Sequence, residues 1–223
     1  MEELKRRTLE LLLGSGAIRF GEYRLKSGRI SPYFVNIGNV TGGDTISELS
    51  DLMAEKTEAD IGIEGFDVVF GPAYKGIVLA SALAVSLCKR HDAIKGFAYD
   101  RKERKTHGEG GDLIGVDMKG KRVLLVDDVI TDGKTKIEAI DRIEGEAKAE
   151  VIGILVVVDR MERDGDGKIF SRIIEEKRGV MVHSLISVID IIEYIEAVGA
   201  DGLGIAADIL VKLKKFVDYP KGG

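Results

Sequence analysis

A short apolar segment that ends in two adjacent carboxylates constrains the fold of this chain more than any other feature. Residues 123–126 form an apolar run typical of a buried parallel strand. Asp127 and Asp128 follow this run, and the small polar residues 131–135 then open a helical pattern whose apolar positions span 137–143. A strand that leads through a glycine turn into a helix favours an α/β fold, in which ligands bind at the carboxyl ends of the strands.

The chemistry of this strand-to-helix turn suits a sugar phosphate. Unpaired backbone N–H groups at the start of a helix can bind a phosphate. Asp127 and Asp128 can accept hydrogen bonds from vicinal hydroxyls or help to hold a hydrated Mg²⁺. The segment 133–135 looks like the end of a Walker A loop, but Asp128 occupies the position where that loop needs its first glycine. A P-loop is therefore excluded, while an ordinary turn with two solvated acids stays open for the motif taken alone.

The rest of the chain alternates between expected strands and helices. Strands are expected at residues 18–26, 30–37, 67–70, 94–99, 121–126, 151–158 and 180–185. Helices are expected at residues 1–14, 44–59 (with Asp44 as N-cap), 75–90, 133–144, 188–198 and 203–216. This order predicts one α/β domain over residues 1–223, with a mostly parallel central sheet flanked by helices. Residues 1–40 and the C-terminal helices are expected to pack together as a small subdomain over the sheet.

Composition and charge exclude several classes of protein. Hydrophobic residues at 44% and charged residues at 32% of 223 describe a soluble globular protein, and a net charge of −5 predicts no general attraction to nucleic acid. The longest apolar stretch, residues 151–158, is too short to span a membrane. The single cysteine, Cys88, cannot form an intrachain disulfide, so we expect a cytoplasmic protein in which Cys88 is a small buried residue.

Three other segments concentrate groups that bind anions. The turn at residues 70–77 combines two glycines and a proline with Lys75 at a helix start, which suits a pyrophosphate. The loop at residues 100–112 carries four cations, His107 and three glycines, and we expect a mobile flap that closes over a polyphosphate. The basic and aromatic turn at residues 25–34 can stack on a flat anionic ring. Each segment taken alone has a simpler interpretation: a tight packing turn for 70–77, a salt-bridged surface loop for 100–112 and a plain hairpin for 25–34.

Together the four segments resemble a known family. Residues 123–133 match the phosphoribosyl-pyrophosphate (PRPP) motif of type I phosphoribosyltransferases. The segments at 71–77, 101–111 and 26–34 resemble those of the orotate phosphoribosyltransferases, and the resemblance runs from about Leu4 to the final helices. It implies the type I phosphoribosyltransferase fold, with residues 1–40 and the C-terminal helices as a hood. It also implies transfer of the phosphoribosyl group of PRPP to orotate, with Mg²⁺, in UMP biosynthesis.

The same resemblance implies roles for individual residues. Asp127 and Asp128 hold the ribose hydroxyls, and Mg²⁺ is held mainly by substrate and water near these carboxylates. Tyr74 and Lys75 meet the pyrophosphate, beside a peptide bond that can be cis. The PRPP loop comprises Val129, Ile130, Thr131, Asp132, Gly133, Lys134 and Thr135, whose amides from Thr131 onward bind the 5′-phosphate. Orotate is contacted by Lys26, Phe34, Val35, Thr131 and Arg160, and the catalytic flap residues are Arg101, Lys102, Lys105 and His107.

The resemblance further implies a homodimer, because in this family the flap reaches into the active site of the partner subunit. Among the flap residues, Lys105 is expected to have the largest single effect, with His107 assisting. The chain departs from the family pattern at Val35, which replaces a second aromatic residue, and at Asp132 and Lys134, which replace smaller ones. Asp132 is expected to point away from the phosphate.

Two alternatives compete with this interpretation. One is a phosphoribosyltransferase for another base, which would lack the turn at 26–34 and the flap at 101–111. The other is a regulator that senses PRPP without catalysis, which could lose the flap cations and would be expected to show a basic face for DNA.

Overall fold

A six-stranded sheet forms the centre of the computed structural model, which describes residues 1–25, 28–102, 112–206 and 208–218. The strand order is β5-β4-β3-β6-β7-β8, and all neighbours are parallel except the edge pair β4 and β5. The strands are β3 (Val68–Gly71), β4 (Gly96–Asp100), β5 (Leu113–Gly115), β6 (Arg122–Ile130), β7 (Glu150–Asp159) and β8 (Met181–Ser187). The expected α/β class with a mostly parallel sheet is confirmed.

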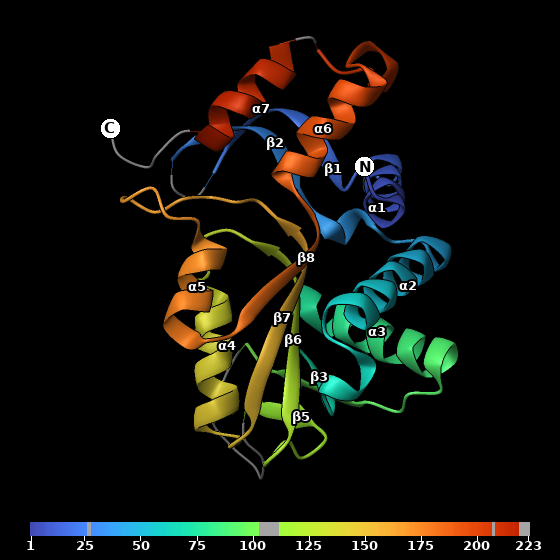
Figure 1. Cartoon of the computed structure of the whole chain (residues 1–223), viewed down its shortest axis with the longest axis vertical. Helices are drawn as coiled ribbons and strands as arrows, with labels where there is room; N and C mark the ends of the chain where they lie inside the picture. The colour runs from blue at the N-terminus through green and yellow to red at the C-terminus, as the bar shows by residue number, and fades with distance from the viewer. Residues whose placement is uncertain (26–27, 103–111, 207, 219–223) are drawn as a thin grey trace.

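Helices cover both faces of this sheet, and alternate residues of each strand serve opposite faces. On β6, Leu124 and Val126 pack in one core with α1 (Glu3–Gly14), α2 (Gly43–Asp60) and α3 (Lys75–His91). The intervening Val123 and Leu125 pack in a second core with α4 (Lys134–Gly145) and α5 (Phe170–Arg178). Figure 1 shows α4 and α5 on one side of the sheet and α2 and α3 on the other.

A two-stranded hairpin packs with the last helices at one end of the sheet. It consists of β1 (Ile18–Arg24) and β2 (Ile30–Val35), which are antiparallel, and lies beside α6 (Val188–Val198) and α7 (Asp208–Asp218) (Figure 1). The ring of Tyr33 meets that of Phe216 edge-on at 5.9 Å between centroids. Arg29 donates to the carbonyl of Phe216, and Arg163 donates to that of Val217 at 3.3 Å. These arginines cap the carboxyl end of α7, where carbonyls otherwise lack partners.

Short one-turn helices complete the chain at η1 (Ile37–Asn39), η2 (Ile63–Gly65) and η3 (Asp201–Leu203). Across the described ranges, no helix is both long and apolar enough to cross a membrane.

Several sequence-based expectations are wrong in detail. The strand expected to stop before the acid pair continues as β6 to Ile130 and pairs with β7 beyond both acids. Asp44 is not an N-cap, because α2 begins at Gly43 and Gly42 precedes it; the Asp44 carboxylate instead accepts the N–H of Thr45 at 2.8 Å. Cys88 is exposed, since it lies on the outer face of α3 rather than on the buried face. Neither β5 nor α5 was expected.

The start of α6 offers a test of local stability. Ser187 and Asp190 form a capping box, in which the Ser187 N–H and hydroxyl both donate to Asp190 Oδ2 at 2.7 Å. Lys5 lies 3.0 Å from the other carboxylate oxygen. Burial opposes ionisation of Asp190, but these hydrogen bonds and the Lys5 ammonium outweigh it and lower its pKa below the usual 3.8.

We expect Asp190→Asn to lower the free energy of unfolding by about 1–2 kcal/mol at neutral pH. Because the folded-state pKa of Asp190 is lowered, its contribution is complete above the unfolded pKa and is lost as pH falls through the folded pKa. Urea unfolding of both proteins at several pH values measures this, and the difference should shrink below pH 3.8. The exposed Asp201→Asn serves as control. An equal loss in both variants, or a difference that grows in acid, would contradict the prediction.

Candidate active site

The two predicted phosphate turns lie side by side at the carboxyl-terminal ends of the central strands β3 and β6. Lys75 is the first residue of α3, after β3, and Asp128 lies near the end of the adjacent strand β6. The Lys75 ammonium lies 2.8 Å from Asp128 Oδ2. The Lys75 side chain is 46% exposed and that of Asp128 14%, so solvent reaches this ion pair. A cation at the start of α3 therefore faces a carboxylate near the end of β6, as expected at the carboxyl ends of parallel strands.

Asp127 lies deeper than Asp128 and has a different partner. Its Oδ2 accepts from Lys136 Nζ at 2.5 Å, and its Oδ1 accepts the N–H of Asp128 at 2.8 Å. Burial raises the pKa of the Asp127 carboxyl, and the neighbouring negative charge of Asp128 adds to this, against the opposing effect of Lys136. Sequence analysis missed Lys136. The sequence did contain a signal for this ion pair, because Lys136 lies in the first turn of the helix that follows the two acids.

The turn between β6 and α4 has the shape expected of an anion-binding helix start. Gly133 precedes α4 with φ of +71°, and a Cβ there would lie 2.8 Å from Cδ1 of Ile174 in α5. Both the backbone angle and this contact favour glycine. Asp132 does not point clear of the turn, because its Oδ1 accepts the N–H of Lys134 at 3.2 Å. A phosphate bound at that amide has to displace the Asp132 carboxylate.

The turn between β3 and α3 is held from two sides. The peptide bond between Ala73 and Tyr74 is cis, as the resemblance implies. The Ala73 N–H donates to Asp100 Oδ1 at 2.7 Å, and the other carboxylate oxygen of Asp100 accepts from Arg142 of α4 at 2.8 Å. Asp100 ends β4, so one carboxylate joins the start of the flap, the pyrophosphate turn and α4. Sequence analysis did not identify Asp100 or Arg142 as site residues.

The flap itself is described only at its two ends. Its base is a strand pair, in which Asp100 lies opposite Leu113, and the Arg101 N–H donates to the carbonyl of Asp112 at 2.8 Å. The Lys102 ammonium lies 5.2 Å from the ring centre of Tyr74, which is 64% exposed. Lys105 and His107 fall outside the described residues.

The predicted orotate contacts divide between surface and interior. Phe34 is 41% exposed and stacks on Tyr23 with 5.3 Å between ring centres. Val35 follows it on β2, so its side chain points to the opposite face and is buried in the core. These two residues cannot both face one bound base. Lys26 falls outside the described residues, and Thr131 is exposed at the start of the phosphate turn.

Arg160 directly follows β7 and is only 4% exposed. Its guanidinium donates to Glu162 at 2.8 Å and to the Ser31 hydroxyl at 3.3 Å, and it lies 4.6 Å from the ring centre of Tyr33. The structure thus brings Arg160 against the β1–β2 hairpin.

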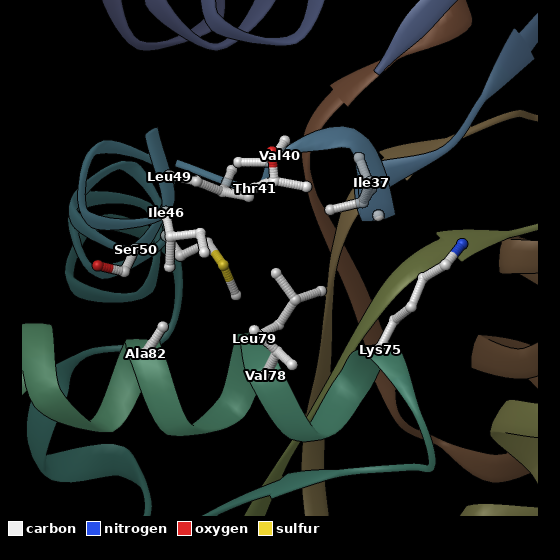
Figure 2. Close-up of a pocket in the computed structure, with 12 residues that line it drawn as sticks. Ile37, Val40, Thr41, Ile46, Leu49, Ser50, Lys75, Val78, Leu79 and Ala82 are labelled. Carbon is white, nitrogen blue, oxygen red and sulfur yellow. The ribbon is translucent and has the colours of Figure 1, made fainter. Parts of the chain in front are cut away.

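An apolar pocket of about 290 Å³ lies between α2, α3 and η1, with Lys75 among its lining residues. Figure 2 shows Leu79 and Ala82 on α3 facing Ile46 and Leu49 on α2, while the Lys75 ammonium points away from them. The Lys75 stem is therefore shared between this pocket and the ion pair with Asp128.

The described residues hold no group of three or more His, Cys, Asp or Glu side chains placed to bind a metal ion. Asp127 and Asp128 each have an ammonium partner. This donor set fits a Mg²⁺ held mainly by substrate oxygens and water, and it does not fit a metal held by the protein alone.

Comparison with known proteins agrees with this geometry. A family model described as the phosphoribosyl transferase domain matches residues 43–182. An orotate phosphoribosyltransferase from Acinetobacter baumannii is 43% identical over 192 residues, which are 86% of this chain and 87% of the relative. The chain belongs to the orotate phosphoribosyltransferase family.

Other relatives support the same family membership. An orotate phosphoribosyltransferase from Stenotrophomonas maltophilia is 44% identical over 87% of this chain and 88% of the relative. The crystal structure of orotate phosphoribosyltransferase from Francisella tularensis has a TM-score of 0.78 and 32% identity, and the match covers 93% of this chain and 96% of that one. The expected type I phosphoribosyltransferase fold is confirmed.

Proposed function

We propose that the chain transfers the phosphoribosyl group of PRPP to orotate, giving orotidine 5′-monophosphate and pyrophosphate in pyrimidine biosynthesis. The observation that carries this proposal is the meeting of Lys75 with Asp128 at 2.8 Å, between the pyrophosphate turn and the PRPP motif. PRPP has a pyrophosphate and a 5′-phosphate on one ribose, and this edge of the sheet offers a turn for each. Family membership supplies the choice of orotate as acceptor.

Each part of PRPP then has its own group of residues. Asp128, with Asp127 behind it, accepts hydrogen bonds from the ribose hydroxyls. The backbone amides of residues 131–135 bind the 5′-phosphate at the start of α4. Tyr74 and Lys75 bind the pyrophosphate, so Lys75 exchanges its carboxylate partner for the substrate.

The reaction breaks the bond between the anomeric carbon and the pyrophosphate oxygen as the orotate ring nitrogen bonds to that carbon. The ring nitrogen gives up its proton, which passes to the departing pyrophosphate or to water. The bonding electrons leave with pyrophosphate, and the ribose gains oxocarbenium character. Cations that strengthen their contacts with the departing oxygens lower the barrier. Lys75, together with Arg101, Lys102, Lys105 and His107 of the flap, carries out this role.

Mg²⁺ is part of the proposal. When bound, it neutralises charge on the leaving pyrophosphate. Asp128 is the protein group that remains available once Lys75 turns to the substrate. We expect protein treated with a chelator to lose turnover, and added Mg²⁺ to restore it.

The base lies under the hood, which we define as residues 1–40 with α6 and α7. Phe34 offers an exposed ring for stacking. The Arg160 guanidinium reaches the hood through Ser31. Placing the base against the Phe34 ring accounts for the hood as a cover that excludes water from the reacting carbon.

The partner of this chain is a second copy, with a flap that reaches into the neighbouring active site. An exposed apolar stripe on α3 supports contact with another subunit, since Val78 and Val85 are each 53% exposed and Cys88 lies on the same outer side. The helix that carries this stripe starts at the pyrophosphate turn. We place the enzyme in the cytoplasm, where an exposed thiol stays reduced.

A panel of bases tests the proposed function. Protein, Mg²⁺ and PRPP are mixed with orotate, uracil, hypoxanthine or adenine in turn, and pyrophosphate release is measured. We expect clear turnover with orotate alone. Preference for another base would replace orotate in the proposal, and PRPP binding without turnover of any base would favour a sensor.

A further inference from the structure

Lys136 is a buried lysine beneath the phosphate turn. It is 4% exposed, although lysine is almost never fully buried without a partner. Its ammonium donates to Asp127 Oδ2 at 2.5 Å, to the carbonyl of Val129 at 2.6 Å and to the Thr135 hydroxyl at 3.4 Å. All three donor positions of the ammonium are therefore used.

Two physical costs oppose a lysine at this position. Burial removes the ammonium from water, and its partners have to compensate for this loss. Lys136 also lies in the first turn of α4, where the helix dipole disfavours a positive charge. A structural role in the core could be filled by an apolar side chain without either cost.

The three acceptors lie on both sides of the phosphate turn. Val129 precedes residues 131–134, Thr135 follows them, and Asp127 lies on β6 beneath. The ammonium thus joins the strand to the helix start and closes the turn from below. The neighbouring Lys134 differs, because its side chain is 79% exposed.

We infer that Lys136 is a positioning residue for the 5′-phosphate end of PRPP: it holds the turn at 131–135 in its binding shape and keeps Asp127 in place under Asp128. The inference rests on the proposed function for the identity of the ligand. It predicts a selective defect, because the pyrophosphate turn at Tyr74 and Lys75 belongs to another strand and helix.

Ribose 5-phosphate and pyrophosphate probe the two ends of the site separately by titration calorimetry. We expect Lys136→Met to weaken binding of ribose 5-phosphate by about tenfold or more, as for loss of a charge-assisted network under an anion. Pyrophosphate binding should change by less than about twofold, and the KM for PRPP should rise more than kcat falls. Lys136→Arg keeps the charge and should restore part of the affinity.

Lys95→Met is the matched control. The Lys95 ammonium is also partly buried and donates to a backbone carbonyl, that of Phe66, at 2.9 Å. Lys95 precedes β4, however, so it lies at the amino-terminal ends of the strands, away from the phosphate turn. The control should bind both probes as the unchanged protein does.

A merely structural lysine would give a lower melting temperature with unchanged affinity of the folded protein for ribose 5-phosphate, and this result overturns the inference. Equal weakening of both probes also overturns it. If Lys136→Met does not fold, Lys136→Gln is measured instead; if neither folds, the role is structural and the inference is rejected. Unchanged protein that binds both probes but turns over no base would overturn the proposed function and leave the comparison of variants valid.

Discussion

Replacing Gly71 by alanine is expected to reduce PRPP-dependent turnover by more than about 100-fold, since a displacement of about 1 Å in a positioning element has that effect. A Cβ at residue 71 would lie 2.0 Å from the carbonyl oxygen of Gly76 and 2.8 Å from the Cβ of Ala80. Both contacts belong to α3, so the helix start that carries Lys75 has to move. Overpacking of this kind also costs roughly 1–3 kcal/mol of stability.

Steady-state kinetics and urea unfolding of Gly71→Ala measure the two effects. Gly145→Ala is the control, because a Cβ there meets nothing within 4 Å and the residue lies at the end of α4. A Gly71→Ala protein that is less stable yet fully active at a temperature where it is folded would contradict the link between this close contact and the position of Lys75.

Two inactive variants are expected to recover activity when they are mixed. Lys105→Ala removes a flap cation and Asp128→Asn removes a ribose contact, and each should lose on the order of 10²–10³-fold in kcat, as for single transition-state contacts. In a mixed dimer with shared sites, one of the two sites combines an intact flap with an intact acid pair. Random exchange in a symmetric dimer then restores about a quarter of the original activity.

The controls for this experiment are pairs that damage the same part of the site. Lys105→Ala mixed with His107→Ala leaves every flap defective, so no recovery is expected. In a mixture of Lys75→Ala and Asp128→Asn, every site has either a defective pyrophosphate turn or a defective acid pair, so no recovery is expected there either. Recovery in these control mixtures, or none in the first mixture at concentrations where subunits exchange, would contradict shared active sites.

Most of the fold could be predicted because its signals are local. The β6–turn–α4 and β3–turn–α3 units each show an apolar run, a glycine turn and a helical period within a few residues. The helix α5 was missed because its 9 residues are too few for a stable isolated helix, and it depends on packing of Ile173 and Ile174 in the core. The three-residue strand β5 depends likewise on pairing with β4.

The sequence predicted several residues that belong to the candidate site, but it did not predict which side chains contact one another there. Lys75 and Asp128 were both assigned from their own motifs, yet they are 53 residues apart and their contact appears only in the fold. The acid pair seemed to end a strand because two carboxylates do not belong in a sheet interior. Lys136 and Lys75 neutralise them there, so β6 continues to Ile130. Asp100 and Arg142 join segments 42 residues apart, which no local pattern reveals.

The way Arg29 and Arg163 hold the carboxyl end of α7 has a consequence for biosynthesis. The β1–β2 hairpin leaves the ribosome early, whereas its partner α7 is the last helix that the structure describes. The described strands of the central sheet are complete at Ser187, so the side that carries the acid pair and Lys75 can fold while the chain is still growing. The hairpin gains its contacts with Phe216 only after α7 is made, so the proposed base-binding side is assembled last. On the proposed function, a newly made chain would complete its PRPP-binding turns before it completes the surface that selects a base.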